Sequence, residues 1–222
     1  MSNTSKGRDT QGGSKDWMQT IINSDMSLSL DNDIGEGRIK WLSPLAADDY
    51  QEYRLNQSPI SELLYIDKNT FSKWWPSPRQ PQWDAIGTTD RDAIILVEAK
   101  AHLNETKNRS MAKAHSYELI KNALKKTHSS MSANTAFNEE VWMKKYYQTA
   151  NRLLFWDNMQ LKYKTILVFL NFIKVPTPRF QTSKEEWNNH TKKIFEALLG
   201  YGVSALPNGI KVIDFEISPF YK

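Results

Sequence analysis

The sequence contains no cysteine among its 222 residues. Disulfides and thiolate metal sites are therefore excluded, and any bound metal must be held by oxygen or imidazole ligands. No apolar run reaches the roughly 18 residues needed to cross a bilayer, and the N-terminus has no hydrophobic signal-peptide centre. Together these absences predict a cytoplasmic protein with no membrane partner.

Apolar residues, by contrast, are plentiful. They make up 40% of the chain, and aromatic residues make up 12%, which is enough to build a sizeable core. We expect a flexible tail over residues 1–15, which is rich in Ser, Gly, Asn and Thr, followed by a single domain over 16–222. The net charge of +4 and the pI near 9.0 permit an anionic partner such as nucleic acid without requiring one.

The order of apolar patterns and turn signals predicts an α/β fold, with a mixed central β-sheet flanked by helices and extra helices before it. Ser43-Pro44 and Ser58-Pro59 each have the form of a capping serine followed by proline in a first helical turn. The expected helices are 44–56, 59–67, 110–127, 139–158 and one opened by the capping box Ser183-x-x-Glu186. The expected strands are 82–88, 93–101, 163–174 and 210–217, the first two joined as an antiparallel hairpin through Gly87 to Asp92.

One expected strand carries two charged residues at the end of a buried run. Because strand side chains alternate, one face should hold Ile94, Leu96, Glu98 and Lys100, and the other Ala93, Ile95, Val97, Ala99 and Ala101. A carboxylate and an ammonium at the end of a buried strand are costly unless they are paired or bound. They therefore indicate a functional site.

A second acid precedes this strand by one hairpin, in Pro81-Gln-Trp-Asp84. Asp84 followed by Glu98-x-Lys100, with helices before and a helix and strand after, resembles the PD-(D/E)xK nuclease superfamily, which has a restriction-endonuclease-like core. Residues 81–102 carry the resemblance, with looser support from 140–172. Two features depart from the family pattern. The proline does not directly precede Asp84, and no clear strand precedes residue 82, although Leu63 to Ile66 is a candidate for it.

The resemblance implies a nuclease that depends on Mg²⁺ or Mn²⁺ and hydrolyses phosphodiester bonds, in DNA as the expected partner. Asp84, Glu98 and the backbone carbonyl of Ala99 would hold the metal, since hard oxygen ligands suit these ions. Lys100 would stand beside the scissile phosphate, orient or help deprotonate the water, and stabilise the transition-state charge. Asp84, Glu98 and Lys100 are the candidate catalytic residues.

Five further residues are candidates for accessory roles at this site: Glu52, Glu62, His102, Gln148 and Arg152. The two glutamates lie on expected early helices, where members of the superfamily often carry one, and His102 continues the face of Lys100. Some members use a glutamine on the later helix. Here Gln148 and Arg152 share the face opposite an apolar stripe formed by Trp142, Tyr146, Ala150 and Leu154, and Arg152 stands where those members have a tyrosine. The alternative for each is an ordinary polar or structural role.

Two other interpretations fit the same residues. One is a non-catalytic nucleic-acid-binding or assembly module that has kept a nuclease-like fold. The other is a structural protein whose strand-end charges pair internally. The sequence leaves open DNA against RNA, the strandedness of the substrate, endonuclease against exonuclease action, cleavage specificity, biological pathway, and whether the protein is a monomer or a homodimer.

Overall fold

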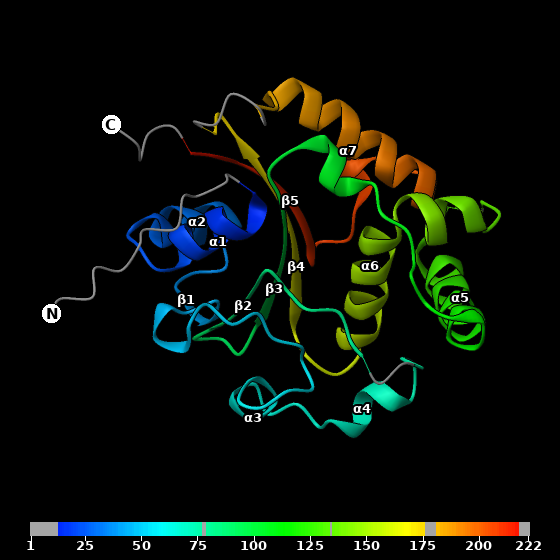
Figure 1. Ribbon diagram of the computed structural model, residues 1–222, viewed down its shortest axis with the longest axis horizontal. Coiled ribbons are helices and arrows are strands. Elements are labelled where there is room, and N and C mark those ends of the chain that lie inside the picture. Colours follow the sequence, from blue (N-terminus) through cyan, green and yellow to red (C-terminus); the bar gives the residue numbers. More distant parts are fainter. Residues whose placement is uncertain (1–12, 77–78, 134, 176–180, 218–222) are drawn as a thin grey trace, which may run out of the picture.

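The computed structural model describes residues 13–76, 79–133, 135–175 and 181–217. A five-stranded sheet in the order β1-β2-β3-β4-β5 lies between two groups of helices (Figure 1). The strands are β1 (Ile39–Ser43), β2 (Ala85–Thr89), β3 (Ile94–Lys100), β4 (Thr165–Ile173) and β5 (Ile210–Glu216). The first three form an antiparallel meander, and β3, β4 and β5 run parallel. The predicted α/β class with a mixed sheet and flanking helices is confirmed.

Helices cover the sheet on both faces (Figure 1). On one side lie α1 (Ser14–Ile22) and α2 (Met26–Ile34), and on the other lie α5 (Ala114–Met131), α6 (Tyr147–Met159) and α7 (Lys184–Leu199). Shorter helices connect these elements: α3 (Ile60–Leu63), α4 (Asn69–Ser72), η1 (Ala46–Asp48), η2 (Leu103–Thr106), η3 (Glu140–Lys145) and η5 (Val203–Ala205). In the part of the chain that the structure describes, no helix is long and apolar enough to cross a membrane.

The two faces of β3 belong to separate apolar cores. Ile94 and Leu96 pack in the cluster that includes the buried side of α6. Ile95 and Val97 pack on the opposite face, in the cluster that includes α1 and α2. The predicted alternation along this strand is confirmed, and it turns Glu98 toward the α6 side of the sheet.

The apolar stripe expected over 139–158 is confirmed, although the helix is not continuous. All of its residues are buried in the larger core: Trp142, Tyr146, Ala150, Leu153 and Leu154. The first turn, η3, has π-helical hydrogen bonding, and α6 begins after it at Tyr147. Ser183 and Glu186 form the predicted capping box at the start of α7.

The early part of the chain differs from the prediction. The helix expected over 44–56 is limited to the single turn η1, since Asp49 and Tyr50 both have positive φ, which ends a right-handed helix. The helix expected over 59–67 is only α3. The strand missing before residue 82 is β1, not the Leu63 to Ile66 segment. Of the expected tail over 1–15, residues 1–12 lie outside the described part, and Ser14 already begins α1.

Candidate active site

Asp84 lies immediately before β2 and is fixed against the end of β3. Its backbone N–H donates to the Val97 carbonyl at 3.2 Å, which extends the β2–β3 ladder by one residue. Its carboxylate turns across the strand pair, and Oδ2 accepts from the backbone N–H of Ala99 at 2.7 Å. The antiparallel hairpin thus brings Asp84 beside Glu98 and Lys100, as its position in the sequence predicts.

Glu98 is the centre of a buried ionic cluster, and its side chain is only 2% exposed. Lys100 Nζ donates to Oε1 of Glu98, and it also donates to the Ala99 carbonyl at 3.1 Å. Arg152 on α6 binds the other carboxylate oxygen, since its Nε and Nη2 each lie 2.6 Å from Glu98 Oε2. Both oxygens of Glu98 are therefore engaged by cations.

Arg152 is itself held in place by two further contacts. Its Nη2 donates to the Gln82 carbonyl at 2.7 Å. Its guanidinium carbon lies 4.5 Å from the centre of the Trp83 ring, which is the geometry of a cation–π contact. These contacts tie α6 to the chain just before Asp84, so the structure brings Arg152 into direct contact with the predicted site.

The charges of the cluster set the protonation of each member. Burial raises the pKa of Asp84 to about 7, and the negative charge of Glu98 adds to this effect. Burial opposes ionisation of Glu98, but the charges of Arg152 and Lys100 outweigh it and hold the pKa of Glu98 below its ordinary value. Burial opposes the charge on Lys100 as well, yet Glu98 and Asp84 outweigh it and raise the pKa of Lys100. At neutral pH the cluster therefore holds an ionised Glu98, an ionised Lys100, and Asp84 near its midpoint.

The start of α6 is set by a residue from a distant segment. Asn108, which follows β3 and η2, accepts at Oδ1 from the backbone N–H of Gln148. Its backbone carbonyl accepts from the N–H of Tyr147 at 3.2 Å. Asn108 thus satisfies two N–H groups that a helix start leaves without intrahelical partners. This cap fixes the register in which α6 presents Arg152 to β3.

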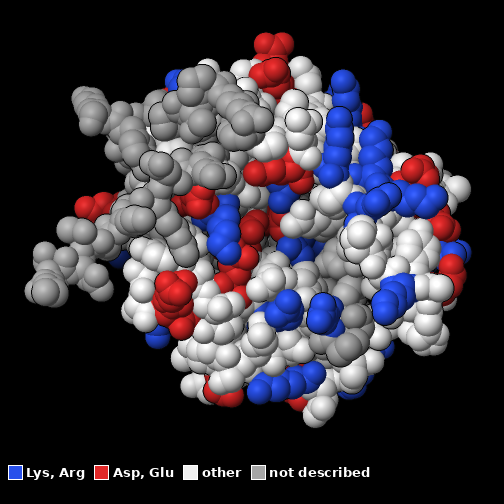
Figure 2. Space-filling view, in the orientation of Figure 1, with Lys and Arg blue, Asp and Glu red and all other residues white. Residues whose placement is uncertain are grey.

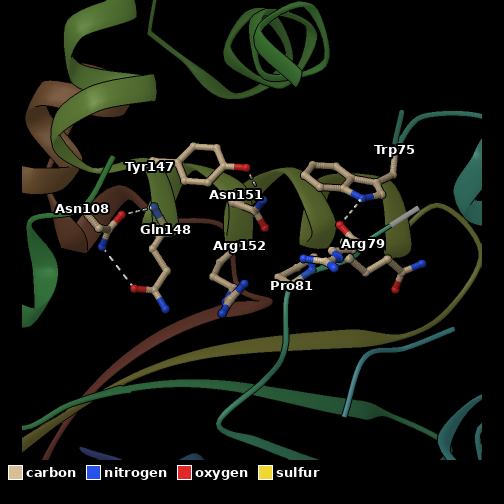
Figure 3. A pocket seen from close by; sticks show the side chains of 9 residues that line it. Trp75, Arg79, Pro81, Asn108, Tyr147, Gln148, Asn151 and Arg152 are labelled. Atoms are coloured by element: carbon tan, nitrogen blue, oxygen red, sulfur yellow. Dashed lines mark hydrogen bonds between the residues drawn. The ribbon is translucent and has the colours of Figure 1, made fainter. Parts of the chain in front are cut away.

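A hollow of about 330 Å³ opens beside the ionic cluster, between α6 and the chain around Trp75 and Arg79 (Figure 3). Arg152 lines the hollow and also binds Glu98, so the two features adjoin. Tyr147 and Trp75 contribute ring surface. The remaining polar lining is formed by side-chain amides, from Gln80, Asn108, Gln148 and Asn151.

Two accessory candidates lie near the site in different ways. Gln148 lines the hollow, and its Oε1 accepts from Asn108 Nδ2 at 3.1 Å. His102 lies just beyond β3, where its Nε2 is 3.6 Å from Oε1 of Glu105. Oε2 of Glu105 accepts from the backbone N–H of Ala101 at 2.7 Å, so this pair closes the turn that follows the strand.

The other two accessory candidates are placed elsewhere. The expectation that Glu52 lies on a helix is wrong, because residues 51–54 are not helical. Its carboxylate pairs with Lys15 at 3.2 Å, although its backbone carbonyl accepts from Gln82 Nε2 at 3.3 Å. Glu62 lies on α3, its side chain is 64% exposed, and it pairs with Lys68 at 3.7 Å. In the described structure, neither carboxylate forms a hydrogen bond or ion pair with Asp84, Glu98 or Lys100.

The oxygen atoms at the end of β3 suit a hard divalent cation. The donor set is the carboxylate of Asp84, the carboxylate of Glu98 and the carbonyl of Ala99. Asp84 is only partly buried, so solvent reaches this end of the site. Burial and the negative charge of Glu98 raise the pKa of Asp84, and a bound cation would offset both effects. Among the described residues no group of three or more His, Asp or Glu could hold a metal. The protein would thus supply two carboxylates and a carbonyl, and water or phosphate the other ligands.

A group of basic residues lies next to the Lys100 end of the site. Thr106 lines a small cavity with Glu98 and Lys100, and its Oγ1 is 2.7 Å from Nε2 of His190 on α7. Burial lowers the pKa of His190, and the positive charges of three lysines lower it further: Lys107, Lys193 and Lys145. We call these three lysines the basic cluster. Figure 2 shows Lys and Arg side chains gathered over the region of α7.

Several of these residues carry no sequence signal that marks them as functional. Trp75, Arg79 and Gln80 belong to a proline-rich connection without periodicity, and Asn108 follows a turn. Asn151 is an exception, because its spacing in the sequence places it on the same helix face as Gln148 and Arg152. The basic cluster draws its lysines from three separate elements, so only the fold assembles it.

Comparison of the chain with models of known protein families, with curated proteins and with solved structures found no match. Function is therefore inferred from the geometry and charge of the site.

Proposed function

We propose that this protein is a nuclease that depends on Mg²⁺ or Mn²⁺ and hydrolyses phosphodiester bonds in DNA. The observation that carries the proposal is the meeting of Asp84, Glu98 and Lys100 at the end of the β2–β3 pair. Two carboxylates, the Ala99 carbonyl and an ammonium lie together, and Arg152 connects them to the neighbouring hollow. This combination suits the charge changes at a phosphodiester undergoing hydrolysis.

Asp84, Glu98 and the Ala99 carbonyl would hold the cation. When bound, a divalent ion supplies charge neutralisation at the phosphate, a more acidic water and help for the leaving oxygen. Ala99 fixes Asp84 through its N–H, so Asp84 Oδ1 remains to face the cation.

Lys100 would act as a charge stabiliser. Because the carboxylates raise its pKa, Lys100 stays protonated at neutral pH and is a poor general base. An ammonium held at this place can neutralise charge that develops on the phosphate oxygens. Its position is fixed by Glu98 and by the Ala99 carbonyl, so little reorganisation is needed.

A polyanionic substrate fits the charges around the site. The basic cluster of Lys107, Lys145 and Lys193 lies beside the Lys100 end, and lysines are the residues that contact phosphate backbones most generally. The net charge of +4 is consistent with the same class of partner. The order of elements around these residues also supports the proposal, because helices precede Asp84, and helices and then the strand β4 follow Lys100, as in the resemblance.

One observation favours the non-catalytic alternative, a nucleic-acid-binding module. Both oxygens of Glu98 already accept from cations, and the charges of Lys100 and Arg152 balance those of Glu98 and an ionised Asp84. A cluster that is balanced internally has less need of a metal ion. In this alternative the protein binds DNA through the basic cluster and does not cleave it.

Incubation with circular duplex, linear duplex and single-stranded DNA separates the two functions. Each substrate is incubated with Mg²⁺, Mn²⁺ or EDTA, and the products are resolved on a gel. The proposal expects cleavage of at least one substrate with a metal and none with EDTA. DNA that is bound but intact under every condition would favour the binding module.

A further inference from the structure

The hollow beside Glu98 contains polar groups whose hydrogen bonding is incomplete. Within the described ranges, Oδ1 of Asn151 and both amide atoms of Gln80 are buried without a hydrogen-bond partner. Each of these residues is 4% exposed. Buried polar groups in native proteins nearly always have partners, so unsatisfied amides that line a cavity indicate a ligand.

The rest of the lining restricts what that ligand is. Trp75 and Tyr147 offer aromatic surface, which suits a flat ring. The Asn151 Nδ2 donates to the Tyr147 hydroxyl at 3.4 Å, which leaves its Oδ1 as the free end of the amide (Figure 3). Side-chain amides offer donors and acceptors in one plane, and the edges of nucleobases present the same pattern. The volume of about 330 Å³ lies within the range of small-molecule sites.

The lining also suits a ring that is attached to an anion. Among the described residues that line the hollow, Arg79 and Arg152 are basic and none is acidic. A nucleotide combines these features, since its base has polar edges and is joined through a sugar to a phosphate. The hollow also adjoins the carboxylates through Arg152, so a nucleotide held there would carry its phosphate toward Asp84 and Glu98.

We propose that this hollow binds one unpaired nucleobase of a nucleic acid, with Asn151 and Gln80 reading its edge and Trp75 and Tyr147 contacting its faces. Because a base inside a duplex is stacked and paired, the preferred substrate is single-stranded DNA or a duplex with an unpaired end. This inference rests on the proposed function for its assignment to a nucleic acid.

Affinity measurements in EDTA test the inference without cleavage. The probes are a fluorescently labelled single strand and the blunt duplex of the same sequence, at one stated salt concentration. The variants are Asn151→Leu and Gln80→Met, which keep the side-chain size while removing the unsatisfied amides. Asn122→Leu, on the exposed side of α5, is the matched control.

The expected result is that the wild-type protein binds the single strand more tightly than the duplex. Asn151→Leu and Gln80→Met should each weaken single-strand binding about tenfold, the effect of losing one or two hydrogen bonds. Duplex binding and the Asn122→Leu protein should be unchanged. Gln80→Met removes only amide atoms that have no partner in the protein, so its thermal unfolding should match or exceed the wild type. Asn151→Leu also removes the 3.4 Å bond from Nδ2 to the Tyr147 hydroxyl, so its unfolding temperature should stay close to that of the wild type.

Single-strand binding by both variants at wild-type affinity would overturn the inference, as would equal weakening for the single strand and the duplex. If Gln80→Met unfolds at a lower temperature than the wild type, the Gln80 amide has a structural role, which also contradicts the inference. A protein that cleaves DNA but has no preference for unpaired bases would refute only the base site. A protein with that preference that never cleaves would refute only the nuclease.

Discussion

Arg152 on α6 and Glu98 on β3 are joined across 54 residues of sequence, with Nε of the arginine 2.6 Å from Oε2 of the glutamate. Both side chains are buried, and Lys100 binds the second carboxylate oxygen. Arg152 therefore stabilises the fold while it occupies an oxygen that a metal would have to share. This contact therefore increases the stability of the fold and lowers the affinity for a metal ion.

Substitution of Arg152→Gln should separate these two effects. Loss of the buried guanidinium leaves Glu98 with Lys100 alone, and we expect the free energy of unfolding to fall by about 2–4 kcal/mol. Removal of a positive charge from the site should tighten Mg²⁺ binding at least about tenfold. Urea unfolding and titration calorimetry measure the two quantities on one preparation.

Arg38→Gln is the control for this experiment, because the exposed Arg38 pairs with the buried Asp31 at 3.7 Å away from the site, and Asp31 keeps its bonds from the Ile39 N–H and Trp41 Nε1. It should change stability by less than about 1 kcal/mol and leave Mg²⁺ binding as it is. An Arg152→Gln protein with unchanged or weaker affinity for Mg²⁺ would show that Arg152 does not compete with the metal.

Lys100→Ala should reduce the rate of DNA cleavage by about 10²–10³-fold with little change in DNA affinity, if the ammonium stabilises charge that develops in the transition state. Glu98 keeps Arg152 as a partner, so the variant should fold. Lys164→Ala, at the opposite end of the sheet, is the matched lysine control. Full activity of the Lys100→Ala protein would remove this lysine from the mechanism.

The stability of the metal-free protein should depend on pH through Asp84. Its pKa rises on folding from 3.8 to about 7, so the folded state holds the proton more tightly than the unfolded state. The resulting stabilisation is complete below pH 3.8 and is lost as the pH rises through 7. Between these values the wild type should lose stability relative to Asp84→Asn, by at most about 1.4 kcal/mol per pH unit.

Urea unfolding of both proteins in EDTA measures this difference in stability directly. The measurements are made at intervals from about pH 4 to about pH 8, the range over which the contribution of Asp84 is lost. The asparagine can still accept from the N–H of Ala99, so the fold should be kept. Parallel curves for the two proteins across the range would show that Asp84 has an ordinary pKa.

Gly87 tests the β1–β2 pairing that completes the sheet. A methyl group at this position would lie 2.6 Å from Cγ2 of Ile39 and 3.1 Å from the Trp41 ring. Gly87→Ala should therefore destabilise the protein by about 1–3 kcal/mol, the usual cost of overpacking. Gly202→Ala, where the nearest atom is 3.8 Å away, should be close to neutral. Thermal unfolding of the two variants makes the comparison, and equal stability would mean that β1 does not pack here as described.

Sequence patterns were sufficient where one element carries its own signal. The alternation along β3 follows from the period of a strand, and the Ser183 capping box follows from local hydrogen bonding. They were insufficient for α2, where serine, aspartate and asparagine separate the apolar residues Met26, Leu30 and Ile34. Such a helix is stabilised mainly by packing on the sheet, which the sequence does not display.

The candidate site likewise combines residues that the sequence identifies with contacts that it does not predict. Asp84, Glu98 and Lys100 are recognisable because the hairpin between β2 and β3 is local. The contact of Arg152 with Glu98 depends on the register of α6, which Asn108 and the π-helical turn set from a distance. No periodicity in the sequence reports either effect. The helix expected over 44–56 failed for a related reason, since the backbone at Asp49 and Tyr50 is left-handed.

The most direct test of the nuclease proposal is the rate of Mg²⁺-dependent DNA cleavage by the wild type and by Asp84→Asn, measured on matched preparations. DNA affinity is determined in EDTA at the same stated salt concentration, since phosphate contacts make affinity depend on salt. We predict cleavage by the wild type, a rate at least about 10²-fold lower for Asp84→Asn, and equal DNA affinity for both. A wild-type protein that binds DNA but cleaves none of its forms with Mg²⁺ or Mn²⁺, or an Asp84→Asn protein as fast as the wild type, would contradict the proposal.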